Sequence, residues 1–234
     1  MKRRFVVIAV FVGGLLKAAD APRVGVFVRG QALVEVSGVS GNFMVSTVLP
    51  EGVVSAAARG DKVLVKTEDS VCLFDGGQMQ QQWRAPSGRA LLALTRDGRP
   101  ARAVFPDQQT EWIWRDKEIV IERPELEVIA LSETRRVVRQ DGRLWLIDAQ
   151  GRRALPDEVV SPAFLPDESL VWLVGRELQF EDGRRVELDV AASRVAVLAD
   201  DWLVVQAGSP NGEQLMVLRG AAGTSLWRLP AVQD

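Results

Sequence analysis

The sequence predicts an all-β fold, a β-propeller of six blades with four antiparallel strands in each blade. Three observations support this prediction. A unit of about 36 residues recurs along the chain, each unit resolves into short apolar segments, and no long helical period follows residue 21. Four strands in a unit of this length are what a propeller blade requires. An all-β sandwich is the alternative, but it gives no reason for a repeat that stays in phase.

Two kinds of sequence mark define the repeat. A proline ends an apolar segment at positions 50, 86, 124, 156 and 230, and Asp189 holds the place between the last two, so that the intervals average 36 residues. An acidic residue marks a second turn in each unit, at Asp61, Asp97, Glu133, Asp167 and Asp200. Both marks keep the same order and period, which indicates one structural unit repeated.

The second and third units show the four strands most clearly. The second unit predicts strands at 53–58, 62–67, 70–75 and 78–84, and the third at 89–95, 101–105, 110–115 and 118–123. Pairs such as Asp97-Gly98 and Asp141-Gly142 separate the strands, because tight hairpins need residues that accept a positive φ. The segments are rich in Val, Ile, Leu, Trp and Phe, as strands are.

The first unit lacks one of the four strands that the other units have. It begins near Arg23 with Val24–Val28, which has the position of a second strand, and no innermost strand precedes it within residues 22–234. Either the first blade has three strands, or its strands are assigned out of phase. The four residues after Pro230 are too few to supply the missing strand.

Residues 1–21 have the layout of a secretory signal peptide, and residues 22–234 form the predicted propeller domain. Three basic residues, at positions 2–4, precede the apolar run Phe5–Leu16, and small residues follow. The run is shorter than the ~20 apolar residues of a membrane-spanning helix. Cleavage after Ala21 fits the small-residue rule, although Pro22 follows, and cleavage after Ala18 is the alternative. We therefore expect a periplasmic or secreted protein of a bacterium, with no membrane span after signal removal.

The composition excludes several kinds of chemistry. The chain has no His and one Cys, so it has no His-dependent triad, no His metal site and no intrachain disulfide. Cys72 lies in an apolar segment, where a small buried hydrophobic residue is expected. Without residues 1–21 the chain has 25 basic and 30 acidic residues, a net charge of −5, which argues against nucleic-acid binding. We expect no cofactor and no metal.

One segment resembles a known repeat. Ser161-Pro162-Ala163-Phe164-Leu165-Pro166-Asp167-Glu168 is similar to the TolB-type β-propeller repeat, Ser-Pro-x-aromatic-Ser-Pro-Asp-Gly, with Leu165 in place of the second Ser and Glu168 in place of the Gly. The segment from Leu144 to Leu155 also looks like part of that repeat. The resemblance implies a six-bladed ring, often exported in bacteria, that commonly binds other proteins or peptides. The α/β domain that precedes the propeller in TolB has no counterpart in this sequence.

The connections that lead into each innermost strand are the candidate partner-binding face. They are short and carry six charged residues: Glu51, Arg89, Arg123, Glu125, Asp157 and Glu158. A shallow face of this kind suits a protein or peptide better than a small substrate. The alternative is that these are solvated turn residues without a partner. The repeated acidic residues are interpreted as turn formers and not as a cation site, and the Trp residues as packing between blades.

The first functional hypothesis is an exported, non-catalytic propeller scaffold that binds a protein or peptide. A propeller enzyme of glycosidase or lactonase type, acting through rim carboxylates, is the second hypothesis. A structural subunit of a cell-envelope complex, which would make its contacts through the ring edge, is the third. The innermost strands argue against an axial catalytic site, because they are small and apolar, as in Ala90–Leu94 and Val128–Leu131.

Overall fold

The computed structural model describes residues 21–116, 118–198, 202–209, 212–219 and 226–230. The predicted signal segment therefore lies, apart from Ala21, outside the described residues, and so does Asp200. The described chain forms six antiparallel sheets, each built from strands that follow one another in the sequence. The all-β propeller prediction is confirmed.

Blade one has three strands and each of the other five has four. The strands of blades one to three are β1 (Arg23–Arg29), β2 (Ala32–Val39) and β3 (Asn42–Leu49), then β4 (Ser55–Arg59), β5 (Lys62–Lys66), β6 (Ser70–Asp75) and β7 (Gln78–Arg84), then β8 (Leu91–Leu94), β9 (Pro100–Phe105), β10 (Thr110–Arg115) and β11 (Glu118–Glu122). The short 3-10 helix η1 (Pro106–Gln108) lies between β9 and β10.

Blades four to six continue the pattern. Their strands are β12 (Glu127–Leu131), β13 (Arg136–Gln140), β14 (Arg143–Asp148) and β15 (Gly151–Ala154), then β16 (Val160–Phe164), β17 (Leu170–Val174), β18 (Glu177–Phe180) and β19 (Arg185–Glu187), then β20 (Ala192–Val197), β21 (Trp202–Ser209), β22 (Gly212–Arg219) and β23 (Leu226–Arg228).

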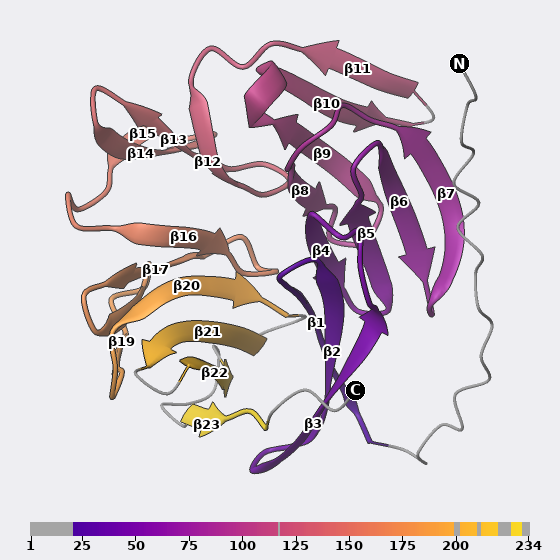
Figure 1. Cartoon of the computed structure of the whole chain (residues 1–234). Coiled ribbons are helices and arrows are strands. Elements are labelled where there is room, and N and C mark those ends of the chain that lie inside the picture. Colours follow the sequence, from indigo (N-terminus) through magenta and orange to yellow (C-terminus); the bar gives the residue numbers. More distant parts are fainter. Residues whose placement is uncertain (1–20, 117, 199–201, 210–211, 220–225, 231–234) are drawn as a thin grey trace.

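The six sheets stand around a common axis, with β4, β8, β12, β16 and β20 nearest the centre (Figure 1). Because each of these blades has four strands, every connection to the next blade lies on the same side of the ring. We call this side the connection face, and it carries residues 50–54, 85–90, 123–126, 155–159 and 188–191. The turns between first and second strands lie on the other side, which we call the turn face.

The first strand of blade one, β1, runs in the direction opposite to that of the innermost strands of the other blades. Arg23, at the start of β1, forms an ion pair with Asp61 on the turn face, with 3.6 Å between the Nη1 and Oδ1 atoms. Gln31, just after β1, accepts a backbone hydrogen bond at 2.9 Å from Val53, which precedes β4 on the connection face. β1 is therefore antiparallel to β4, as a second strand is. Within the described residues, blade one has three strands and no innermost strand of its own, which is the first of the two alternatives that the sequence left open.

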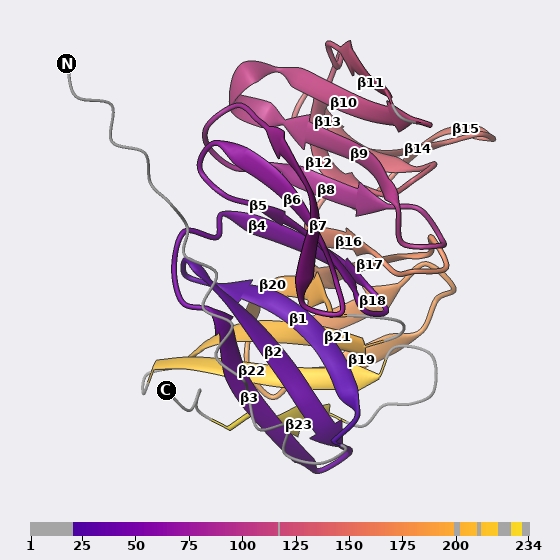
Figure 2. The ribbon, with the colours of Figure 1, turned by 90° about the vertical axis from the view of Figure 1, so that its right-hand side faces the viewer.

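The ring closes between blades six and one by side-chain packing. These two sheets share no hydrogen-bonded strands among the described residues. A buried cluster joins them instead, with Phe43 and Val45 of β3 against Val217 of β22 and the partly buried Trp202 and Trp227. Figure 2 shows blade one beside the yellow strands of blade six. Packing of apolar side chains therefore holds blades six and one together, as hydrogen bonds hold together the strands within each blade.

Aromatic residues fill the outer part of other blade junctions too. The rings of Trp83 in blade two and Trp114 in blade three lie 5.4 Å apart, and Phe105 and Trp112 lie 4.8 Å apart within blade three. Such edge-on pairs add to the area that aromatic residues bury. The interpretation of the Trp residues as packing between blades is confirmed for these positions. Cys72 is buried as predicted, and burial raises the pKa of its thiol.

A search for membrane-spanning helices among the described residues finds none of the necessary length and apolar character.

Candidate functional site

The innermost strands enclose an axial cavity of about 260 Å³. Its lining is mostly Ala, Val, Leu and Ile side chains, contributed by β1, β4, β8, β12, β16 and β20. Among the described lining residues the charged ones are Arg59 and Arg194, and none is Asp or Glu. A pair of carboxylates for acid–base chemistry is therefore not found on this lining.

The six sequence-predicted site residues are all exposed and all lie in connections between blades. Those connections are short because each fourth strand ends near the start of the next innermost strand. The structure spreads the six residues around the connection face and does not gather them, and no two of them form an ion pair with each other. Arg123 donates to the Gln109 side chain, and Asp157 pairs with Arg143 at 3.6 Å. The face is a shallow surface of mixed charge.

Two of the repeated acidic residues, Asp97 and Asp167, act in their own turns as predicted, whereas Glu133 and Asp61 contact a neighbouring blade. Asp97 accepts from the Arg99 guanidinium at 2.7 Å, and Asp167 accepts from the Ser169 backbone N–H at 2.9 Å. A hydrogen bond from Thr95, the largest contribution, lowers the pKa of Asp97. No group of three or more potential metal-ligating side chains occurs among the residues that the structure describes.

Sequence reasoning missed a chain of contacts that links these turns from blade to blade. The Arg96 backbone N–H donates to the Glu133 carboxylate at 3.0 Å, and the Glu133 backbone N–H donates in turn to the Glu168 carboxylate at 3.1 Å. Lys62 donates to the Asp97 carbonyl at 3.3 Å. The turns of blades two to five on this face are therefore joined each to the next, and Asp97, Glu133 and Asp167 already have hydrogen-bond partners.

Glu168 occupies a turn position at which the backbone is left-handed. Its φ of 69° lies in the region that favours Gly. Gly98 holds the same place in the equivalent turn of blade three, with a φ of 79°. The Glu168 side chain reaches blade four and accepts hydrogen bonds from Glu133 and Thr134. The strained backbone is thus offset by a contact between blades that Gly cannot make.

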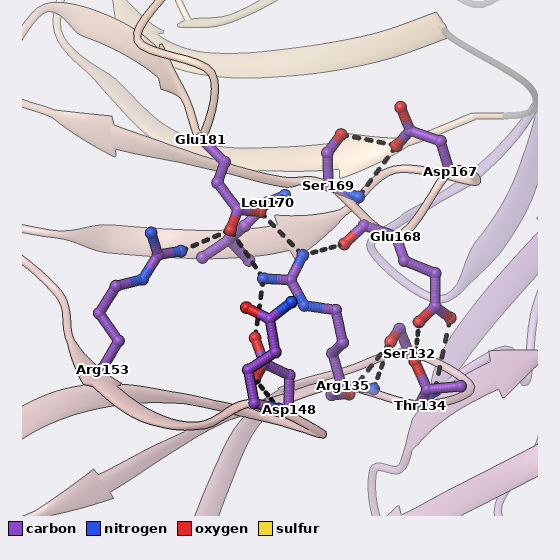
Figure 3. A network of polar contacts seen from close by, with 11 residues as sticks. Ser132, Thr134, Arg135, Asp148, Arg153, Asp167, Glu168, Ser169, Leu170 and Glu181 are labelled. Carbon is purple, nitrogen blue, oxygen red and sulfur yellow. Dashed lines mark hydrogen bonds and ion pairs between the residues drawn. The ribbon is translucent and has the colours of Figure 1, made fainter.

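The densest polar cluster joins blades four and five on the turn face (Figure 3). Arg135 donates to both carboxylate oxygens of Glu181, at 2.7 and 2.8 Å, and to the Glu168 carbonyl at 2.5 Å. Its guanidinium also lies 3.4 Å from Asp148. Glu181 accepts further hydrogen bonds from Arg153 and from the Leu170 backbone N–H. This bidentate, largely buried arrangement is the strong form of an ion pair.

The contacts in this cluster stabilise the charged forms of Glu181 and Arg135. The hydrogen bonds from Arg135, with smaller contributions from Leu170 and Arg153, lower the pKa of Glu181 to about 2, although burial opposes the shift. The same contacts raise the pKa of Arg135. Because Arg135, Arg153 and the Leu170 N–H already bind the Glu181 carboxylate, the cluster is suited to holding the two blades together. The only sequence signal for it was the unusual Glu168.

Comparisons with known proteins identify the fold and no family. No protein-family model matches the sequence. A search of curated proteins finds no match either.

Several solved structures resemble the chain. The β-propeller domain of Cps50 (Swd1) from Myceliophteria thermophila gives a TM-score of 0.50 at 11% identity, over 86% of this chain and 72% of that one. PorZ of Porphyromonas gingivalis, a bacterial surface component of the type-IX secretion system, gives 0.50 at 13% identity, over 87% and 31%. Hsv2 of Kluyveromyces lactis gives 0.47 at 14% identity, over 75% and 63%, so the chain spans less than two thirds of Hsv2. The chain is thus a β-propeller of six blades, the first of them three-stranded.

Proposed function

We propose that this chain is an exported bacterial propeller of TolB type that binds a protein or peptide partner through its connection face and does not catalyse a reaction. The observation that carries the proposal is the contrast between the two surfaces open to a ligand. The axial cavity is small and lined mostly by apolar side chains, whereas the connection face offers six exposed charged residues on short loops. Proteins and peptides bind such shallow mixed-charge surfaces, while small substrates favour deep pockets.

Site-specific crosslinking in the native host tests the binding face. A photo-reactive residue placed at Glu125, Arg89 or Asp157 should crosslink to one and the same partner. The matched controls are Asp97 and Asp182, which are equally exposed but lie on the turn face, and we expect no crosslink to that partner from them. Crosslinks from the controls alone, or equally from both faces, would contradict the proposal.

Export is tested by the N-terminus of protein purified from its native host. We expect the mature chain to begin after Ala18 or Ala21, because the basic and apolar segments precede these small residues. Intact-mass measurement reports this directly. A chain that still begins at Met1 would show that residues 1–21 are not a cleaved signal.

A role as a structural subunit of an envelope complex is a second proposal, in which the ring edge makes the contact. It is favoured by one observation, the exposed apolar side chains on the outer hairpin of blade one. An enzymatic function is not favoured by any contact among the described residues.

A further inference from the structure

The outer edge of blade one is an open strand edge. Within the described residues β3 pairs with β2 and with no other strand. A two-residue turn joins these strands and Val39 pairs with Asn42, so the residues that bond to β2 are Asn42, Met44 and Ser46. The N–H and C=O groups of the alternate residues, at 43, 45 and 47, therefore point away from the sheet. They form a row to which another strand can bond.

This edge lacks the charges that the other outer edges carry. β3 is eight residues long and has no charged side chain. The outer strands of the other five blades are shorter, and every one contains Arg or Glu, with examples in Arg84 of β7 and Glu118 of β11. Charged residues on an edge strand normally prevent pairing with other chains. Blade one is without that protection.

Apolar side chains are exposed along the same hairpin. Met44 is 44% exposed and Val48 is 43% exposed on β3, and Val39 is 57% exposed on β2. Met44 lies on the sheet face opposite Phe43, whose side chain packs on blade six, so Met44 faces blade two. Blade two presents Met79 of β7, which is 48% exposed. Met79 pairs across the strands with Phe74, so the two side chains share one face, and Phe74 packs in the cluster between blades one and two. Flexible methionine side chains suit an adaptable docking surface.

The chemistry of the surroundings selects the occupant. The charged residues on this face of β1 and β2, Arg23 and Glu35, form an ion pair with each other at 2.9 Å, and Arg23 also pairs with Asp61 of blade two, so these charges already have partners. A charged side chain in the added strand would be desolvated against Met44 and Val48 without a partner. An uncharged segment with apolar residues at alternate positions would cover those side chains and satisfy the backbone row at the same time.

We propose that the outer edge of β3 is a second interaction site, at which an uncharged, extended segment of a partner polypeptide adds to blade one as a further strand. The site is separate from the connection face. Strand addition derives its affinity from main-chain hydrogen bonds and its specificity from alternate side chains. A second copy of this chain, or residues 1–20 of the chain itself, are the other occupants that the test distinguishes.

The test uses a fluorescent eight-residue peptide of alternating threonine and valine, and a control peptide of the same sequence with every second amide N-methylated. Fluorescence anisotropy should show binding of the first peptide and not of the second, because N-methylation removes the donors. Hydrogen exchange should slow at the amides of Phe43, Val45 and Thr47 on binding, and remain unchanged at Met44 and Ser46.

The protein variants are Thr47→Pro and its matched control Thr47→Ala. Proline removes only an N–H that points away from β2 and is tolerated at such edge positions, so the fold should be retained. We expect Thr47→Pro to weaken peptide binding by about tenfold or more, and Thr47→Ala by no more than about twofold. Equal binding by folded Thr47→Pro, or equal binding of the N-methylated peptide, would overturn the proposal.

Two further outcomes would assign the edge to another occupant. A wild-type dimer in sedimentation that becomes monomeric in Thr47→Pro would identify a second copy. A chain that binds the peptide only after removal of residues 1–20 would identify its own N-terminal segment. Either result overturns the assignment to a partner polypeptide while leaving the crosslinking test of the connection face unaffected.

Discussion

Replacing Phe43 with alanine is expected to lower the free energy of unfolding by about 3–4 kcal/mol, the range for large-to-small changes in a core. The Phe43 ring is buried at the junction of blades six and one, with its centroid 5.7 Å from that of Trp202 and 5.8 Å from that of Trp227. Since these blades share no strand hydrogen bonds among the described residues, the loss falls on the packing that closes the ring. Denaturant unfolding measures the change.

The same variant should also lose protection against hydrogen exchange, mainly in blade one. We expect faster hydrogen exchange in β1–β3 than in blades two to five, because no strand hydrogen bonds join blades one and six among the described residues. Met44→Ala is the matched control: it removes the next side chain on the same strand, but this one is 44% exposed, and it should cost less than about 1 kcal/mol. Equal losses in the two variants would mean that the Phe43 cluster does not close the ring.

Replacing Arg135 with methionine is the second large change, with an expected loss of about 2–4 kcal/mol. The Arg135 and Glu181 side chains are 15% and 19% exposed, so removing the guanidinium leaves a largely buried carboxylate without its main partner. Arg153 and the Leu170 N–H remain to bind Glu181, which keeps the loss below that of an isolated buried charge. Thermal or denaturant unfolding of the variant measures it.

The contribution of Glu181 should depend on pH in a defined direction. Its folded pKa of about 2 lies below the unfolded value of about 4.3. Its contribution is therefore complete above about pH 5 and is lost as the pH falls through about 4 toward 2. Wild type should exceed Glu181→Gln in stability by about 1–2 kcal/mol at neutral pH, allowing for partial solvent screening, and the difference should shrink as the pH falls and disappear only below about pH 2.

Arg99→Met provides the control for this cluster. Arg99 pairs with Asp97 in the equivalent turn of blade three, but the two side chains are 69% and 60% exposed. An exposed pair contributes little, so the change should cost less than about 0.5 kcal/mol. A loss as large as that of Arg135→Met would indicate that burial of the pair is not the source of the effect.

Local pattern was sufficient to predict the blades. The strands predicted at 62–67, 70–75 and 78–84 match β5, β6 and β7 to within one residue, because alternating apolar residues and Gly-containing turns are properties of neighbouring residues. For blade one the repeat left two alternatives, a three-stranded blade or strands assigned out of phase, and the structure confirms the first. The six candidate site residues were placed in the right connections, and their role remains a proposal.

Contacts between blades could not be predicted in the same way. Arg135 and Glu181 are 46 residues apart, and Phe43 and Trp227 are farther apart still, so no local period relates their side chains. The sequence by itself determined the repeat, the number of blades and the absence of His-dependent chemistry. Only the tertiary structure decided how the ring is closed, which charges are paired across blades and which strand edge is left open. These features depend on where separate units meet in space, and a repeat defines each unit without specifying what its surface will touch.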